Sequence, residues 1–406
     1  MDAVSRELAA NFDIEKLTPE FYADPYPTYR ALREHAPVKL LPNGSYFLTR
    51  YDDLVSAYKN TRLFSSDKKK EFAPKYGASL LYEHHTTSLV FNDPPAHTRV
   101  RRLIMGALSP RAIAGMEPDL IALVDRLLDT LAVKGRVELI EDFASAIPVQ
   151  VIGNLLDVPM EEREPLRDWS LAILGALEPV IGPDVFARGN AAVKDFLAYL
   201  EILVARRRAK PGNPERDVLT RLIQGEDNGE RLTAKELLHN CIFLLNAGHE
   251  TTTNLIGNGL ELLLRFPDQR RRLLAEPALI KTAVEEFLRY ESSNQLGNRS
   301  VAEAAELGGI ALPKGTLITL CIGAANRDPD EFTAPDNLDI GRTPNRHLAF
   351  ATGAHACAGL NLARLEGRIA IGRFIARFPN YEANGPARRA RRARFRGFTE
   401  FPVKLG

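Results

Sequence analysis

The sequence lacks the features that mark secreted, membrane-spanning and nucleic-acid-binding proteins. Only 3 of its 406 residues are cysteines, and 53 lysines and arginines nearly balance 52 aspartates and glutamates, for a formal net charge of +1. Three cysteines are too few for a disulfide framework in a chain of this length, which favours a reducing cytoplasm. Because the charge is balanced, we do not expect net charge to drive binding to nucleic acid or to an anionic membrane.

Long hydrophobic runs are also missing. The longest apolar stretches, such as residues 241–245, are far shorter than the ~20 residues that a membrane-spanning helix needs. Residues 1–17 carry charges throughout, which is incompatible with a signal peptide. With 45% hydrophobic and 26% charged residues, the composition is that of a globular protein with a large core.

Apolar residues recur at helical spacing along much of the chain. We predict helices over residues 119–131, 183–208, 232–265, 277–290 and 357–378. The Asn43-Gly44 pair predicts a hairpin between strands 38–41 and 46–49, and further strands are expected near residues 299–303, 308–311, 316–320 and 398–404. Residues 326–347 are predicted to form a long loop that carries function. The expected fold is mainly α with minor β-sheets (α+β), in a single domain over residues 1–406.

One cysteine lies in a distinctive local sequence. Residues 350–359 read FATGAHACAG, so that Cys357 falls at the start of a predicted helix with Gly353 and Gly359 on either side. Free N–H groups at a helix N-terminus stabilise a thiolate, and glycines let a flat ligand approach the backbone closely. A thiolate held in this way is a suitable axial ligand for iron. The alternative for a lone cysteine is a buried residue that acts as a small hydrophobe.

A second motif, AGHETT, occupies residues 247–252 of the longest predicted helix. Ala247 and Gly248 leave room beside the helix, and a threonine hydroxyl can bond back to a carbonyl one turn earlier. The adjacent acid and alcohol, Glu250 and Thr251, then suggest a proton relay, whereas the alternative is a packing contact between helices. A zinc-protease site is excluded, because the position four residues after the motif's histidine is Thr253.

Two further pairs have helical spacing. Glu286 and Arg289 are three residues apart and can pair on one helix face. His97 and Arg101 are four apart and face the same way, as donors for carboxylates would. Either pair alone can be an ordinary polar helix face.

Together, these motifs resemble those of the cytochrome P450 haem-thiolate monooxygenases, from about residue 20 to the C-terminus. The family usually has glycine where this chain has Ala351. The resemblance implies the cytochrome P450 fold, a haem b cofactor, and activation of O2 with insertion of one oxygen atom into a small, largely apolar substrate. It implies that Cys357 ligates the iron, and that Thr251, assisted by Glu250, delivers protons.

The resemblance also implies the residues that surround the cofactor. The haem contacts are expected to be His97, Arg101, Arg299 and His355 at the propionates, Phe350 near the sulfur, Ala247 and Gly248 at the oxygen-binding groove, and Gly353 and Gly359 in the cysteine loop. Glu286, Arg289 and Arg342 are expected to form a buried structural network. The expected pocket walls are Leu174, Phe243, Leu244, Gln295, Leu296 and Phe398.

Electrons must come from outside the chain, because it has no Gly-rich phosphate loop or dinucleotide fingerprint of its own. By analogy with bacterial family members, we expect a ferredoxin with a ferredoxin reductase that uses NAD(P)H. Basic residues on the cysteine side, such as Arg102 and Arg364, could receive an acidic donor.

Some alternatives stay open at this stage. Six arginines between residues 388 and 396 form either a patch for an anionic partner or a solvated turn. The polar run at residues 292–295 either bonds a polar substrate group or forms an exposed turn. A peroxide-driven peroxygenase and a non-catalytic haem sensor compete with the monooxygenase, although the Glu250-Thr251 pair argues against both.

Overall fold

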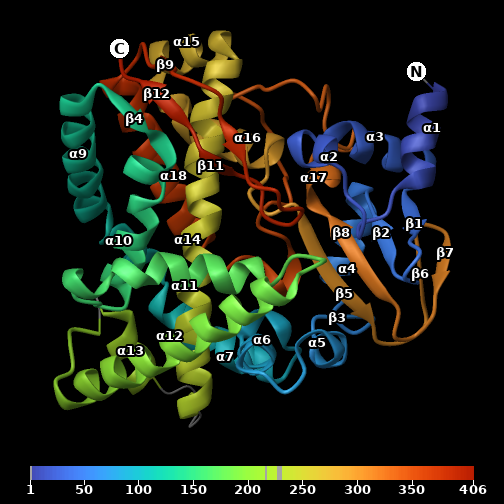
Figure 1. The fold of residues 1–406 in the computed structure, drawn as a ribbon, viewed down its shortest axis with the longest axis horizontal. Coiled ribbons are helices and arrows are strands. Elements are labelled where there is room, and N and C mark those ends of the chain that lie inside the picture. The colour runs from blue at the N-terminus through green and yellow to red at the C-terminus, as the bar shows by residue number, and fades with distance from the viewer. Residues whose placement is uncertain (1, 215–216, 226–230) are drawn as a thin grey trace.

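A 32-residue helix, α14 (Ala234–Arg265), crosses the helical part of the molecule (Figure 1). It begins with a capping box, in which the Thr233 side chain accepts from the Glu236 N–H and the Glu236 carboxylate accepts from the Thr233 N–H. The predicted helix over residues 232–265 is therefore confirmed. The computed structural model describes residues 2–214, 217–225 and 231–406.

Other helices pack around α14 and bury its apolar residues. Its neighbours are α6 (Leu80–Thr87), α10 (Ala146–Leu155), α11 (Glu164–Gly175), α12 (Pro183–Ala209), α16 (Ile280–Tyr290) and α18 (Leu360–Arg377), and α9 (Glu117–Lys134) packs on α18. Gly259 of α14 permits one close approach, because a Cβ there would lie 2.7 Å from Ile371 of α18. These helices form the largest hydrophobic core of the described residues.

A five-stranded sheet lies beside the helical part, with helices α1 to α4 nearby (Figure 1). Its order is β1 (Val38–Leu40), β2 (Tyr46–Leu48), β8 (Leu317–Cys321), β5 (Leu296–Val301) and β3 (Phe64–Ser65). Only the β2–β8 pair is parallel. The hairpin predicted at residues 43–44 is confirmed, and Gly44 has the positive φ of +80° that such a turn requires.

The remaining elements are short, apart from α7. The helices are α1 (Asp2–Asn11), α2 (Pro19–Ala23), α3 (Tyr26–His35), α4 (Tyr51–Lys59), α5 (Lys69–Tyr76), α7 (Ala96–Ala107), α8 (Pro110–Ala114), α13 (Val218–Gln224), α15 (Pro267–Ala275) and α17 (Ile322–Ala325). The strands are β4 (Arg136–Glu138), β6 (Ala305–Leu307), β7 (Ile310–Leu312), β9 (Glu382–Ala383), β10 (Arg388–Arg389), β11 (Phe398–Glu400) and β12 (Pro402–Lys404). Short turns of 3₁₀- or π-helix are η1 (Leu89–Phe91), η2 (Ile140–Ala144), η3 (Met160–Glu162), η4 (Pro277–Leu279) and η5 (Gly353–His355).

Most predicted elements are present, with three differences. The helix predicted from residue 357 begins at Leu360, so the cysteine lies in the loop before it. The segment predicted at 277–290 opens with η4 before α16. The strand predicted over 398–404 is two strands in two different sheets, because β11 pairs with β10 whereas β12 pairs with β4 and β9. The predicted fold class, mainly α with minor sheets, is confirmed.

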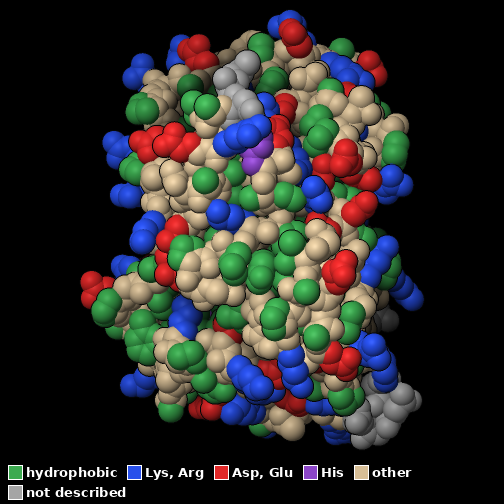
Figure 2. Space-filling view, turned by 90° about the vertical axis from the view of Figure 1, so that its right-hand side faces the viewer, with side chains coloured by type: hydrophobic (Ala, Val, Ile, Leu, Met, Phe, Trp, Pro, Cys, Tyr) green, Lys and Arg blue, Asp and Glu red, His purple; other side chains and the backbone are tan. Residues whose placement is uncertain are grey.

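The surface in Figure 2 carries basic and acidic side chains interspersed, without a large area of one sign. This matches the balanced formal charge. Within the described ranges, no helix combines the length and the apolar character needed to cross a bilayer.

Candidate active site

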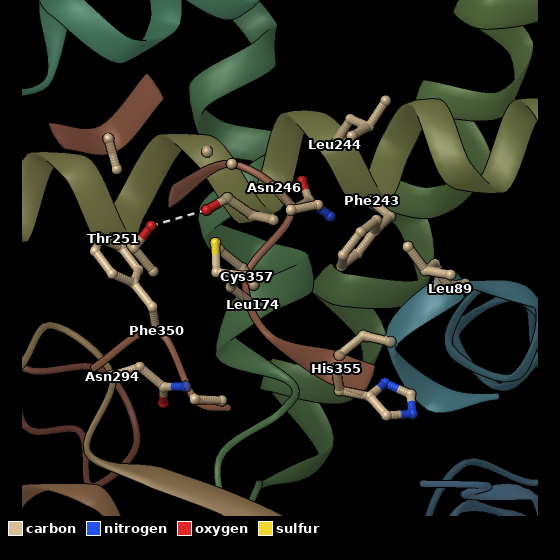
Figure 3. A pocket seen from close by; sticks show the side chains of 18 of the residues that line it. Leu89, Leu174, Phe243, Leu244, Asn246, Thr251, Asn294, Phe350, His355 and Cys357 are labelled. Atoms are coloured by element: carbon tan, nitrogen blue, oxygen red, sulfur yellow. Dashed lines mark hydrogen bonds between the residues drawn. The ribbon is translucent and has the colours of Figure 1, made fainter. Parts of the chain in front are cut away.

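A cavity of about 340 Å³ lies between α14 and the loop that carries Cys357 (Figure 3). Thr251 and Phe243 face it from α14, Cys357 faces it from the opposite side, and Leu174 faces it from α11. Most of the lining side chains are apolar. The two motifs that the sequence separates by about a hundred residues therefore face one another across a single space.

The backbone of the cysteine loop is folded tightly. The Cys357 N–H donates to the Phe350 carbonyl at 2.9 Å, which closes the loop. Gly353 has φ +74°, and a Cβ there would lie 2.7 Å from the Tyr58 carbonyl oxygen, so that a side chain does not fit. Ala351 also has a positive φ, +52°, at the position where the family usually has glycine.

The surroundings of the sulfur raise its pKa overall, so that a thiolate there needs a cationic partner such as a metal ion. Burial raises the pKa of the Cys357 thiol, while a hydrogen bond from the Gly359 N–H and the charges of Arg101 and Arg364 oppose this rise. Cys357 is the only one of the three cysteines that lines the cavity. Cys241 and Cys321 are fully buried, and burial raises the pKa of each to about 12.

The predicted propionate residues gather at one side of this cavity. His97 from α7 and His355 from η5 stack, with ring centroids 3.9 Å apart. Arg101, one turn along α7 from His97, donates to the Ala356 carbonyl, and Arg299 on β5 donates to the Asn298 carbonyl. All four residues line the cavity.

These groups lack acidic partners. Within the described residues, neither Arg101 nor Arg299 forms an ion pair with a carboxylate. Both ring nitrogens of His97, Nε2 of His355 and Nε of Arg299 are buried without a hydrogen-bond partner. Burial and the nearby charges of Arg299, His97 and Arg101 lower the pKa of His355 to about 3. Two guanidinium groups and ring nitrogens without partners, beside a half-buried thiol, suit a flat iron-containing cofactor that carries two carboxylates. Haem b is such a cofactor.

On α14, the Thr251 hydroxyl donates to the Ala247 carbonyl at 2.8 Å, as the sequence predicts (Figure 3). Ala247 and Gly248 also line the cavity. Gly248 has a second role, because a Cβ there would lie 2.4 Å from Ile152 of α10. The glycine therefore lets α10 pack against α14 as well as leaving room in the cavity.

Glu250, which the sequence predicts to assist Thr251, does not share the cavity with it. Its side chain does not line the cavity, and one carboxylate oxygen pairs with Arg392. Adjacent residues of a helix point about 100° apart, so that an acid and an alcohol at consecutive positions do not face each other. The second oxygen, Oε2, is buried without a partner, and burial raises the pKa of Glu250 against the opposing charge of Arg392.

The predicted structural network is present. Arg289 donates to both oxygens of Glu286 at 2.7 and 2.8 Å, and Arg342 approaches the same carboxylate at 3.1 Å. Glu286 and Arg289 are 0% exposed. Arg289 also donates to the carbonyls of Asn326 and Pro335, which ties the long loop at residues 326–347 to α16.

The predicted pocket walls are partly displaced. Leu174, Phe243, Leu244 and Leu296 line the cavity, but Gln295 and Phe398 do not. The Gln295 amide turns away to donate to the Ser292 carbonyl, and Phe398 packs under Arg389, whose guanidinium lies 4.1 Å from the ring centre. Their places are taken by neighbours, which are Asn294 and Phe395. An isolated β-bridge joins these two residues, a long-range pairing that no local pattern reveals.

Several polar lining residues escaped the sequence analysis. His84 and His85 on α6, Asn246 on α14 and Glu366 on α18 all line the cavity. Burial raises the pKa of Glu366 to about 8, and its Oε1 has no partner. A histidine pair and an isolated asparagine carry no recognisable motif, so only the structure identifies them.

The arginine-rich segment is only partly solvated, because four of its six arginines contact residues inside the protein. Arg392 pairs with Glu178 and Glu250, and Arg396 pairs with Glu291. Arg388 and Arg391 are exposed, whereas Arg389 pairs with Glu291 and Arg394 lines the cavity. Arg364 is likewise engaged, in a bidentate pair with Glu285.

Comparisons with known proteins agree with this geometry. The family model for cytochrome P450 matches residues 171–384. The chain is 36% identical over 364 residues to the biotin biosynthesis cytochrome P450 of Bacillus subtilis, covering 89% of this chain and 91% of that protein. It is 35% identical over 400 residues to the 6-deoxyerythronolide B hydroxylase of Saccharopolyspora erythraea, covering 95% of this chain and 97% of that protein.

Solved structures show the same fold. P450BioI, in complex with an acyl carrier protein ligated to hexadec-9Z-enoic acid, superposes with a TM-score of 0.90 at 35% identity, covering 95% of this chain and 100% of that chain. The chain therefore belongs to the cytochrome P450 family. It is an oxidoreductase of the haem-thiolate monooxygenase class.

Proposed function

We propose that this enzyme inserts one oxygen atom of O2 into a small organic substrate with a largely apolar body, using two electrons from an external carrier. The main support for this proposal is that Cys357 and Thr251 face each other across one mostly apolar cavity. Apolar walls with a few placed polar groups are typical of small-molecule sites.

The chain's residues divide the work around a haem b group. Cys357 would hold the iron, and Arg101, Arg299, His97 and His355 would hold the propionates. When bound, haem supplies O2 activation and transfer of one oxygen atom to the substrate. The apolar walls exclude water and hold the substrate body near the Thr251 side of the cavity.

Thr251 is proposed to deliver protons from its Oγ1, the hydroxyl that now donates to the Ala247 carbonyl. Glu250 is proposed to supply the proton from a position on α14 outside the cavity, where it pairs with Arg392. Its raised pKa and unpartnered Oε2 make it a proton carrier, but it must first leave Arg392 or act through water.

A ferredoxin served by an NAD(P)H-dependent reductase is the proposed electron source. Arg102 is exposed on α7, the helix whose neighbouring Arg101 contacts the cysteine loop, and is proposed as part of the docking face for an acidic donor. Arg102→Glu should slow reduction by a ferredoxin and weaken the dependence of that rate on salt. An unchanged rate would argue against this docking face.

The thiolate assignment has a direct spectroscopic test. Purified holoprotein, reduced under carbon monoxide, should show a Soret band shifted far to the red, and Cys357→His should show the band of a histidine-ligated haem instead. A wild-type band like that of a globin would overturn the proposal.

Turnover tests the proton role. With a surrogate ferredoxin, Thr251→Ala should keep consuming NAD(P)H while the product formed per NAD(P)H falls sharply. Thr253→Ala is the matched control, because the Thr253 hydroxyl also donates to the carbonyl one turn earlier, that of His249, but does not line the cavity. Full coupling in Thr251→Ala would show that the hydroxyl is dispensable. A protein driven by peroxide alone, without NAD(P)H, would instead be a peroxygenase.

A further inference from the structure

Arg394, in the loop between β10 and β11, lies on a wall that two cavities share. The inner one is the cavity described above, and the outer one has a volume of about 430 Å³. Both are lined by Phe91, Leu177, Leu296, Asn298 and Arg394. The outer cavity also touches the exposed residues Glu15 and Asn43, so that it adjoins the surface. A molecule that passes from the outer to the inner cavity would meet Arg394.

The guanidinium of Arg394 has only neutral partners. It donates to the carbonyls of Leu177 and Leu296 and to the side-chain oxygen of Asn298. Three of its five N–H groups are used in this way, which leaves one on each terminal nitrogen. Among the described residues, no carboxylate forms an ion pair with it.

The surrounding charges do not balance. Arg299 also belongs to this group, but its charge is assigned to the proposed haem propionates. The other cations are the four residues Lys68, Lys75, Arg392 and Arg394, against the three carboxylates of Glu71, Glu178 and Glu250. Each carboxylate already has a partner, since Glu71 pairs with Lys68 and the other two pair with Arg392. One positive charge of this group is therefore left without an internal anion, at the half-buried side chain of Arg394. An unpaired charge that is largely removed from water is destabilising.

A second observation points to a ligand at the same place. His85 is 1% exposed and lines the inner cavity, and neither of its ring nitrogens has a hydrogen-bond partner. Burial lowers the pKa of His85 to about 3, and the charges of Lys75 and Arg394 add to this effect. The neutral ring keeps one N–H that can donate to an acceptor placed near Arg394.

We propose that the substrate is an amphipathic organic acid whose carboxylate is bound by Arg394 and His85 at the junction of the two cavities. This inference rests on the proposed function, because it names the class of substrate for that same site. The single unmatched positive charge matches one carboxylate, whereas a phosphate dianion would leave an excess of negative charge. The apolar body of the acid would then lie in the inner cavity, toward Cys357 and Thr251.

Binding to the purified holoprotein tests the proposal without turnover. Octanoate, decanoate, dodecanoate and naphthaleneacetate are each compared with the matching primary alcohol by titration calorimetry and by the Soret shift. We expect at least one acid to bind about tenfold or more tightly than its alcohol, the difference that a hydrogen-bonded charge supplies. If no acid of the series binds more tightly than its alcohol, the proposal is wrong.

Variants then test which residues cause the preference for an acid over its alcohol. Arg394→Gln should lose it, and Arg394→Lys should keep part of it. Arg391→Gln, an exposed arginine of the same loop that lines neither cavity, should keep it fully. His85→Phe, which preserves the ring but removes its nitrogens, should reduce it. An Arg394→Gln protein that keeps the full preference would also overturn the proposal.

The failure of this inference is distinguishable from failure of the proposed function. A globin-like carbonyl spectrum defeats the haem-thiolate assignment whatever the ligand affinities are. A thiolate spectrum with equal affinities for acid and alcohol defeats only the carboxylate site.

Discussion

Two groups of arginines in this protein differ in their partners. Arg289 is completely buried and bonds both oxygens of Glu286, and Arg396 is paired with Glu291. Arg299 is buried and Arg394 is half-buried, but their partners are carbonyl or amide oxygens. The first group is neutralised within the chain and holds the fold together. The second lines the cavity, where we propose that it meets negative charge that arrives with a ligand.

The largest expected effect on stability comes from removing the carboxylate that pairs with a buried arginine of the first group. Glu286→Gln would leave Arg289 and Arg342 facing a neutral amide in a buried site, at a cost of about 3–5 kcal/mol in the free energy of unfolding. Urea unfolding of the holoprotein, followed by circular dichroism, measures this loss. Asp125→Asn, which breaks the half-exposed pair with Arg373, is the control and should change stability by less than about 1 kcal/mol. Equal effects of the two changes would remove the distinction between the groups.

The second prediction concerns the group that lacks carboxylates. Arg299→Gln removes a buried cation without leaving a carboxylate unpaired, so the fold should lose little stability. Haem should nevertheless be held less tightly, by about tenfold, because a charged hydrogen bond to a propionate is lost. Transfer of haem to apomyoglobin measures this, and Arg373→Gln is the surface control. An unchanged transfer rate in Arg299→Gln would contradict the propionate role.

Glu366 is the opposite case to these cations, because it is a buried acid with no cationic partner. Burial raises its pKa from an ordinary value of 4.5 to about 8. Its protonated form therefore contributes stability fully below pH 4.5, and this contribution is lost as the pH rises through about 8. Glu366→Gln should be more stable than wild type above pH 8 and should lack this part of the pH dependence. Urea unfolding at pH 6 and about pH 9 checks the sign, and parallel pH profiles would contradict it.

The smallest expected effect concerns the backbone beside the sulfur. Ala351 adopts φ +52°, a conformation that costs an L-residue about 1 kcal/mol relative to glycine. Ala351→Gly should therefore raise the melting temperature of the holoprotein slightly, or leave it unchanged once the greater freedom of glycine in the unfolded chain is included. A marked fall in the melting temperature would show that the methyl group packs usefully, and differential scanning calorimetry can resolve the outcomes.

Sequence alone predicted the parts of the site that are local. The cysteine loop and the α14 motif each lie within ten consecutive residues, so that their spacing identifies them. The partner of Glu250 could not be predicted in this way, because Arg392 is 142 residues away in the chain. Gln295 and Asn294 were confused for a related reason, since a one-residue change in which side chain faces the cavity depends on the bridge to Phe395.

The inward-facing arginines have a consequence for the order in which the protein is made. Glu250 and Glu291 leave the ribosome 142 and 105 residues before Arg392 and Arg396, which neutralise them. Until the last segment is synthesised, both acids lack these counter-charges, and the adjoining faces of the nascent molecule are expected to stay hydrated. The segment with Arg392 and Arg396 thus completes the neutralisation of the interior late in synthesis. A chain that stopped before this segment would leave Glu250 and Glu291 without these cationic partners.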